Sequence, residues 1–209
     1  FNIAAFYTEY SNLQISIFDG SIGFKVGNAK EAVTMGIEMD GRWQVTDYLS
    51  LGGALALLDF EFTDFPNGQC RQDQVSDSPN GRDCNYTGWS NQYVADWSGT
   101  FIIGYIRPIS HTLGIGASLD VIFTDDYNPS SNLDPRVEQD AFYKVNGRLG
   151  IGAIDQSWEL ALIGKNLTDE VIVVYAADTP LAKNLFGTTS HTGFIDAPRS
   201  VALQFTYRM

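Results

Sequence analysis

The sequence predicts an all-β protein, an antiparallel transmembrane β-barrel to which this chain contributes about eight strands. Eight segments alternate apolar and polar residues with a period of two, which is typical of strands with two different faces. Most of them reach about ten residues or more, the length that a tilted strand needs to cross a bilayer. Short and long connections alternate between the segments, as they do in membrane-spanning barrels.

The predicted strands are bounded by connections rich in Gly, Asn, Asp and Pro. Their residues are 2–16, 32–46, 49–62, 93–106, 112–125, 141–154, 157–167 and 199–209. Tight turns are predicted at 46–48, 107–111 and 155–156, and long polar loops at 17–31, 63–92, 126–140 and 168–198. A soluble β-sandwich rarely needs four long loops on one side, so this asymmetry favours the membrane barrel.

The alternation is clearest in the second, fifth, sixth and last predicted strands, where the charged residues keep to one parity. We interpret that parity as the face that lines a water-filled lumen. The predicted lumen-facing polar residues are Glu38, Asp40, Arg42, Asp120, Lys144, Arg148, Glu159 and Lys165. The third strand is less regular, since Leu55 and Leu57 are out of phase with Phe60 and Phe62, and we interpret this break as a β-bulge.

Aromatic residues of the apolar parity gather near the ends of the predicted strands. Near the short turns these are Trp43, Tyr105, Trp158 and Tyr207, and near the long loops Trp97, Phe123 and Tyr143. Two aromatic bands separated by aliphatic residues are typical of the two membrane interfaces, so we predict an aromatic girdle at each. The alternative is a soluble protein whose core aromatics lie near strand ends.

Composition excludes several classes of protein. A net charge of −12 with only 13 Lys and Arg argues against binding to a nucleic-acid backbone. No run of about 18 apolar residues is long enough for a membrane-spanning helix. No signal peptide follows Phe1, so either it has been removed or the sequence is part of a longer chain.

The two cysteines, Cys70 and Cys84, lie in one polar segment and predict a disulfide that closes a surface loop. A zinc site there is disfavoured because the two histidines, His111 and His191, are far off in sequence, and we predict no metal site and no cofactor. The histidines fall in connections at opposite ends of the predicted barrel, so we predict no catalytic site.

The long loops also contain candidate ligand-binding residues. Rings of Tyr86, Trp89 and Tyr127 offer stacking surfaces to a bulky ligand. Asp125 and Asp126 form an acidic pair beside Tyr127, and we count them among the possible ligand-binding residues. Such acids could also serve acid–base chemistry or hold a divalent cation, but solvated loop carboxylates are the favoured interpretation.

Three segments resemble one protein family. The run from Asn28 to Glu38, with Ala32 and Gly36 between them, resembles the N-x-x-x-A-x-x-x-G-x-E stretch of TonB-dependent outer-membrane receptors. Residues 164–170 look like the end of the penultimate strand of that family, and residues 198–207 are similar to its closing strand. The resemblance extends over essentially the whole chain.

The resemblance implies the last third of a barrel of about 22 strands, preceded by a plug domain and an energy-coupling segment that this sequence does not contain. It also implies a bacterial outer-membrane receptor, not an enzyme, whose partners are lipid, TonB and a small molecule. Iron chelates such as ferric siderophores are the expected cargo, with oligosaccharides as another possibility. The alternatives are a self-contained small outer-membrane barrel and a secreted carbohydrate-binding β protein.

Overall fold

The computed structural model describes residues 1–18, 24–78, 81, 83–182, 185 and 187–208. These residues form ten strands and the 3₁₀ turn η1 (Pro135–Val137). The strands are β1 (Asn2–Phe18), β2 (Phe24–Gln44), β3 (Leu49–Asp64), β4 (Trp97–Pro108), β5 (Leu113–Thr124), β6 (Phe142–Ala153), β7 (Trp158–Lys165), β8 (Val173–Asp178), β9 (His191–Ile195) and β10 (Ser200–Tyr207). Within the described ranges, no helix has the length and apolar character to cross a membrane.

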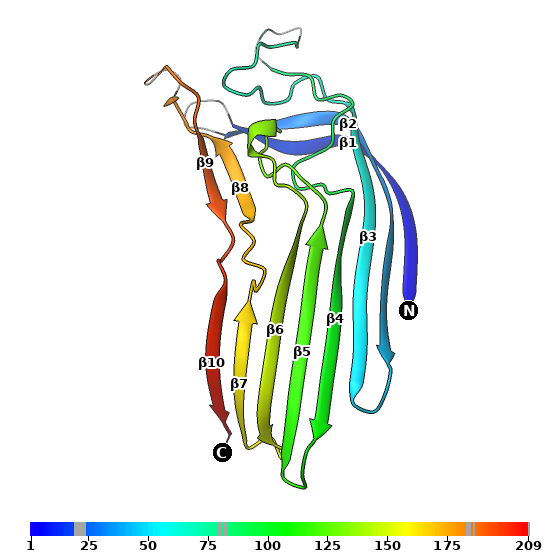
Figure 1. Ribbon diagram of the computed structural model, residues 1–209. Helices are drawn as coiled ribbons and strands as arrows, with labels where there is room; N and C mark the ends of the chain where they lie inside the picture. Colours follow the sequence, from blue (N-terminus) through cyan, green and yellow to red (C-terminus); the bar gives the residue numbers. More distant parts are fainter. Residues whose placement is uncertain (19–23, 79–80, 82, 183–184, 186, 209) are drawn as a thin grey trace.

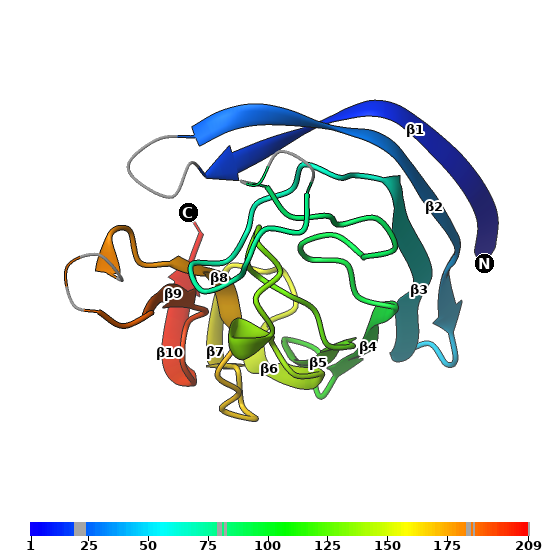
Figure 2. The same cartoon turned by 90° about the horizontal axis from the view of Figure 1, so that it is seen from above.

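Eight strands form one antiparallel sheet in the order β1-β2-β3-β4-β5-β6-β7-β10. β8 and β9 interrupt this order along the chain and pair with each other in a separate hairpin. Seen from above, the sheet curls into an arc with β1 and β10 as its edges, and long loops lie within the arc (Figure 2). The predicted all-β antiparallel architecture is therefore confirmed, and the barrel is not closed within this chain.

The three tight turns predicted from the sequence lie at the end of the sheet opposite to the long loops (Figure 1). In the first, Thr46 Oγ1 accepts hydrogen bonds from the N–H groups of Tyr48 (3.2 Å) and Leu49 (3.0 Å). Ser110 Oγ and Asp155 Oδ1 accept from backbone N–H groups in the same way in the other two turns. Short polar side chains favour such turns because they satisfy backbone donors that no strand can reach.

The predicted loop at 17–31 is largely wrong. β1 runs to Phe18 and β2 begins at Phe24, and the two remain paired up to these residues. Residues 19–23, where the connection falls, lie outside the described residues. Both strands bend over the loop end of the sheet (Figures 1 and 2). The prediction failed because polar residues in this stretch interrupt the alternation of apolar and polar side chains. The backbone hydrogen bonds that pair two strands do not require an apolar face.

Two other predicted boundaries also differ from the structure. The predicted loop at 168–198 contains the β8–β9 hairpin, whose strands have only six and five residues. The fourth strand begins at Trp97 and not at 93, and Tyr93 has a positive φ of 63°, which is far from the extended conformation of regular strands. Short or interrupted segments of this kind give too few residues for a period to be recognised.

Strand pairing brings the residues of the mainly apolar parity of each sheet strand onto the same face. Directly paired residues of an antiparallel ladder point to the same side. One row of the ladder joins Leu51 to Ile103, Ile103 to Leu119, and Leu119 to Gly147. Because the alternation and the pairing agree from strand to strand, the sheet has one largely aliphatic face and one polar face.

Phe60 and Phe62 point to the face opposite to Leu57 without a β-bulge between them, so the predicted bulge is wrong. The pairing of β3 with β2 runs without a break through this region, and its register shifts only beyond Phe62. What changes is polarity, because Asp59 and Glu61 occupy the outward face near the loop end. There the inward face packs on loop residues, so it is the inward face that is apolar.

A buried hydrophobic core lies between this end of the sheet and the loops. It consists of Ala29, Ala32, Phe62, Phe65, Cys84, Tyr86 and Leu133. Ring centroids are 4.9 Å apart for Phe62 and Phe65, and 5.5 Å apart for Phe65 and Tyr86. Each fully buried apolar side chain stabilises by roughly 1.5–3 kcal/mol, so this core fixes the first loop on the sheet.

Candidate ligand-binding site

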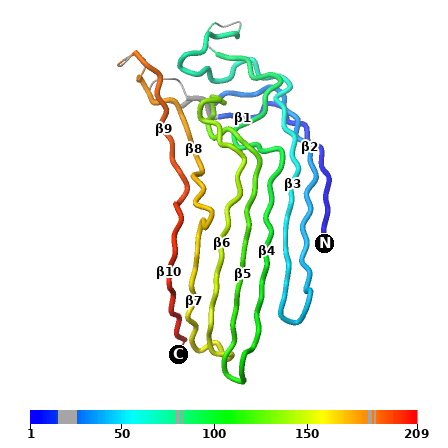
Figure 3. Tube along the Cα trace, in the orientation of Figure 1, coloured from blue at the N-terminus to red at the C-terminus, as the bar shows by residue number. Residues whose placement is uncertain are grey.

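Three long connections, residues 65–96, 125–141 and 166–199, gather at one end of the sheet (Figure 3). They are joined to one another by hydrogen bonds. The Gln72 N–H donates to Asp178 Oδ2 at 3.0 Å, and the Tyr93 hydroxyl donates to the Val174 carbonyl at 3.0 Å. The loops therefore form one connected surface above the sheet.

The first connection is closed by a disulfide between Cys70 and Cys84, whose Cα atoms are 5.0 Å apart. Gly68 and Cys84 exchange two backbone hydrogen bonds of 2.8 and 3.0 Å beside it. Tyr86, two residues after Cys84, is buried, and its hydroxyl donates to the Gln69 carbonyl. Burial raises the pKa of the Tyr86 hydroxyl. Tyr86 thus belongs to the core, and its ring is not available for stacking on a ligand.

The other four candidate ligand residues line one cleft of about 340 Å³. Its wall includes Trp89, Asp96, Asp125, Asp126, Tyr127 and Glu138. Small-molecule sites have volumes of roughly 300–1,000 Å³, so the cleft matches the lower end of that range. Trp89 is exposed, and the Tyr127 hydroxyl is held by the Val173 carbonyl at 3.1 Å. The cleft presents two aromatic rings and four carboxyl groups.

Negative charge is concentrated in this cleft. The pKa of Glu138 is raised by burial, by a hydrogen bond with Asp126, and by the charges of Asp126 and Asp140. A carboxyl group whose ionisation is opposed by neighbouring carboxylates lies in a negative potential. Such a potential favours cationic groups of a ligand over anionic ones.

The predicted polar and aromatic residues of the sheet lie on opposite faces. The strand pairing puts Glu38, Asp40, Arg42, Asp120, Lys144, Arg148, Glu159 and Lys165 on the polar face. It puts Trp43, Trp97, Tyr105, Phe123, Tyr143, Trp158 and Tyr207 on the aliphatic face. Within that set, Trp158 pairs with Tyr207 near the tight turns, and Phe123 pairs with Tyr143 near the loops.

Several side chains of the polar face are paired with one another. Arg148 makes a bidentate ion pair with Glu159, with N–O distances of 2.8 and 2.7 Å. Asn146 donates to the Asp120 carboxylate at 2.6 Å. Lys144 forms an ion pair of 2.6 Å with Asp196, which belongs to the connection after β9. The polar face is thus an ordered network that reaches up to the loops.

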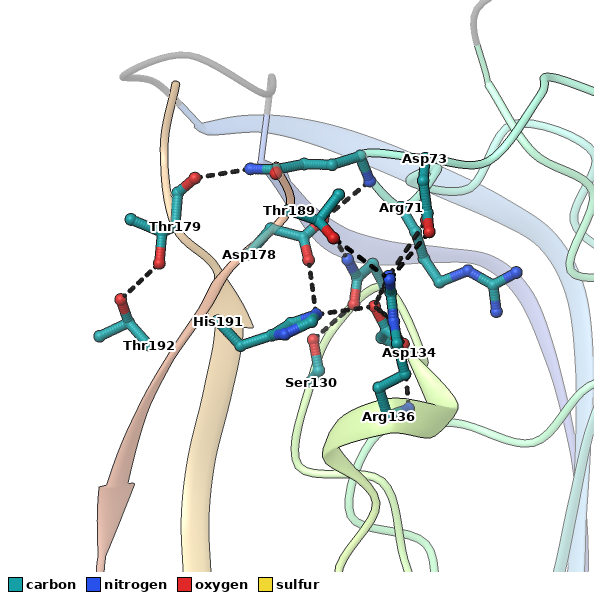
Figure 4. Close-up of polar contacts among 12 residues, drawn as sticks. Arg71, Asp73, Ser130, Asp134, Arg136, Asp178, Thr179, Thr189, His191 and Thr192 are labelled. Atoms are coloured by element: carbon teal, nitrogen blue, oxygen red, sulfur yellow. Dashed lines mark hydrogen bonds and ion pairs between the residues drawn. The ribbon is translucent and has the colours of Figure 1, made fainter. Parts of the chain in front are cut away.

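A second polar cluster lies within the loops (Figure 4). Asp134 is fully buried and accepts from the Arg136 guanidinium at 2.6–3.2 Å and from His191 Nε2 at 3.0 Å. Burial alone would raise the pKa of Asp134, but the hydrogen bonds from Arg136 and His191 outweigh it and hold that pKa well below its usual range. Arg136 also pairs with Asp73 at 2.8 Å.

This cluster was not predicted from the sequence. Its histidine and its two buried acids come from two different connections, and 57 residues separate His191 from Asp134. The sequence signal that points to it is the pair Asp134-Pro135, which is typical of the start of a helical turn. That signal places a turn but does not identify its partner. His111, as expected, lies in a tight turn at the other end of the sheet.

Solved structures with the same architecture include siderophore receptors. The chain is similar to the ferric yersiniabactin uptake receptor FyuA from Yersinia pestis, with a TM-score of 0.68 and 15% identity over 97% of this chain and 26% of that one. For the siderophore receptor PiuA from Acinetobacter baumannii the TM-score is 0.67 and the identity 19%, over 98% and 25% of the two chains. For the ferric preacinetobactin receptor BauA from Acinetobacter baumannii the values are 0.60 and 13%, over 97% and 26%.

At these identities the likeness establishes the fold alone. This chain spans about a quarter of the length of each of those receptors. No curated protein sequence matches it. The family model for the TonB dependent receptor-like β-barrel matches residues 1–167, which is more than half of the chain. The chain therefore belongs to the TonB-dependent receptor β-barrel family, whose members are bacterial outer-membrane proteins.

Proposed function

We propose that this chain is the last third of the barrel of an outer-membrane receptor, which captures a bulky nutrient in its loops and imports it with energy supplied through TonB. The cargo that we propose is a ferric siderophore or another iron chelate. The observation on which this rests is the cleft above the sheet, which joins aromatic and acidic side chains directly over a polar inner face. The similar solved structures, which are siderophore receptors, support the same cargo class.

The route of the cargo follows from the two faces of the sheet. A ligand released from the cleft would pass along the polar face, where Arg148, Glu159 and Lys144 offer charged contacts. The opposite face, with its aliphatic centre and aromatic ends, would meet lipid. In this proposal Trp43 and Trp158 lie at the periplasmic interface and Trp97 at the outer one.

Uptake by living cells tests the proposal. A strain that lacks the gene for this chain is grown under iron limitation with single ferric chelates, and uptake of radioactive iron is compared with that of the complemented strain. We expect uptake of at least one chelate to require the gene. We also expect uptake, but not surface binding, to stop when TonB is deleted. Uptake that needs neither the gene nor TonB would contradict the proposal.

Variants of the cleft test where the ligand binds. Trp89→Ala removes an exposed ring, and we expect it to weaken chelate binding about tenfold, which corresponds to about 1.4 kcal/mol. Asp126→Asn removes a cleft carboxylate and is matched by Asp47→Asn in the exposed turn at the other end of the sheet. The matched variant should bind and import as the parent does. Equal effects of both Asp variants would rule out this cleft as the binding site.

A further inference from the structure

The loop cluster of Figure 4 brings one imidazole nitrogen and two carboxylate oxygens to a single point. Asp134 lies in the connection between β5 and β6, Asp178 ends β8, and His191 begins β9. One ligand atom of each lies within 4.8 Å of those of the other two. Both aspartates are buried, whereas the side chain of His191 is 23% exposed.

The distances fit the edges of a metal coordination tetrahedron. His191 Nε2 lies 3.0 Å from Asp134 Oδ2 and 3.4 Å from Asp178 Oδ1. Zinc binds imidazole nitrogen and carboxylate oxygen at about 2.0–2.2 Å, and tetrahedral geometry then separates neighbouring ligand atoms by roughly 3.3 Å. The two distances from His191 Nε2 therefore match edges of such a site, and the two carboxylate oxygens lie within 4.8 Å of each other.

One of these atoms has no hydrogen-bond partner within the part of the chain that the structure describes. Asp178 Oδ1 is buried, and the side chain is only 4% exposed. Its other oxygen, Oδ2, accepts from the Gln72 N–H at 3.0 Å and from Asn132 Nδ2 at 2.9 Å. These two donors fix the carboxylate with Oδ1 directed at His191. A buried carboxylate oxygen without a hydrogen-bond partner destabilises the folded state, and a cation bound to it would remove that destabilisation.

A hydrogen-bonded histidine alone does not satisfy the cluster. Nε2 carries at most one proton, and the shorter distance assigns that proton to Asp134. Asp178 Oδ1, at 3.4 Å, is then left with a weak contact at best. A metal ion in place of the proton would bind both oxygens and the nitrogen together.

The charges around the cluster also favour a divalent cation. Among the described residues labelled in Figure 4, the carboxylates of Asp73, Asp134 and Asp178 are opposed by the guanidinium groups of Arg71 and Arg136, which leaves one negative charge uncompensated when His191 is neutral. Arg136 binds both oxygens of the Asp134 carboxylate. Its Nε and backbone N–H donate to Oδ1, and its Nη2 donates at 2.6 Å to Oδ2, the oxygen that also contacts His191. Hydrogen bonds of this kind hold a metal-binding carboxylate in the required orientation.

We propose that Asp134, Asp178 and His191 bind one divalent transition-metal ion of the zinc type. A nitrogen ligand together with carboxylates suits Zn²⁺, whereas Ca²⁺ takes oxygen ligands only. The ion would fasten the β8–β9 hairpin to the connection between β5 and β6, which also forms the wall of the acidic cleft. This proposal is independent of the cargo that the receptor imports.

Metal titration of the intact protein that contains this chain tests the site. The protein is purified in detergent, stripped with a chelator, and titrated with ZnCl₂ by calorimetry and with CoCl₂ by visible absorption. We expect one zinc site that His191→Gln and Asp178→Asn each weaken at least 100-fold. His111→Gln and Asp47→Asn, which lie in tight turns at the other end of the sheet, are the matched controls and should leave zinc affinity unchanged. We expect Co²⁺ to show the intense absorption of a tetrahedral site.

If a variant does not fold, zinc-edge X-ray absorption of the unmutated protein tests whether His191 can be a zinc ligand. One imidazole in a shell of nitrogen and oxygen ligands at roughly 2.0 Å supports the site. The proposal is overturned if zinc does not bind, if His111→Gln abolishes binding while His191→Gln does not, if the zinc shell has no imidazole, or if the site prefers Ca²⁺ to Zn²⁺.

Discussion

Replacing Ile103 by Arg should destabilise the protein far more than the same replacement at its neighbour Ile102. The two residues have the same side chain and lie next to each other near the middle of β4. Ile103 pairs with Leu51 and Leu119 on the aliphatic face. Ile102 pairs with Asp120 on the polar face. The comparison therefore separates the two faces while residue type, strand and depth stay the same.

The expected magnitude follows from the depth of the position. An Arg that faces lipid near the bilayer midplane costs about 2–4 kcal/mol in a membrane barrel. For Ile103→Arg this is a change of about two orders of magnitude in the folding equilibrium, at 1.4 kcal/mol for each factor of ten. Ile102→Arg should cost less than about 1 kcal/mol, because the new guanidinium faces water and the Asp120 carboxylate.

The assay is equilibrium folding of the intact protein into phospholipid vesicles from guanidinium chloride, followed by tryptophan fluorescence. The two variants and the parent are compared at the same lipid concentration, and the slope of each transition shows whether the unfolded surface is unchanged. Equal destabilisation by both variants, or a larger effect at Ile102, would refute the assignment of lipid to the aliphatic face.

Three further predictions concern the loop end. Phe62→Ala should cost about 3–5 kcal/mol in denaturant unfolding because Phe62 is only 1% exposed in the core, whereas Phe1→Ala at an exposed position should have little effect. Replacing Cys70 and Cys84 together by Ser should destabilise by roughly 3 kcal/mol, since the bond closes a loop across a separation of 14 residues, and an unchanged melting temperature in non-reducing buffer would contradict this. Lys144 lowers the pKa of Asp196 by a hydrogen bond, aided by the Ala197 N–H, so the stabilisation from this partly exposed pair should be complete above the unfolded Asp pKa of roughly 3.9 and be lost as the pH falls through the lower folded value. A double-mutant cycle of Lys144→Gln and Asp196→Asn should give about 0.2–1 kcal/mol at pH 7, and a coupling that persists below the folded pKa would contradict the pairing.

Features that depend on neighbouring residues could be predicted from the sequence. The period-two alternation assigned the residues of β2, β5, β6 and β10 to two faces, and the ladder agrees with that assignment. The tight turns were predictable for a similar reason, because Thr46, Ser110 and Asp155 bond to backbone groups two or three residues away. In both cases the information lies within a few positions of the residue concerned.

Alternation predicts the wrong feature where the apolar parity switches from one face of a strand to the other along its length. Phe60 and Phe62 were interpreted as the mark of a bulge, although they keep the register of β3 and turn inward to the loop core. Tyr86 was predicted to face a ligand and is instead buried beneath Trp89, whose ring stacks 5.8 Å away. The face of a strand that the loops cover could not be predicted from the sequence.

By itself, the sequence determined the existence of the eight sheet strands, the two faces of β2, β5, β6 and β10, the tight turns and the family resemblance. Only the tertiary structure determined how the loops are arranged. In it β8 and β9 pair as a hairpin, four of the candidate residues line one cleft, and His191 lies beside Asp134 and Asp178. The physical reason is the difference in sequence separation between the residues that interact. Alternation and turn chemistry act over a few residues, whereas contacts between loops join positions dozens of residues apart, and only the folded sheet brings them together.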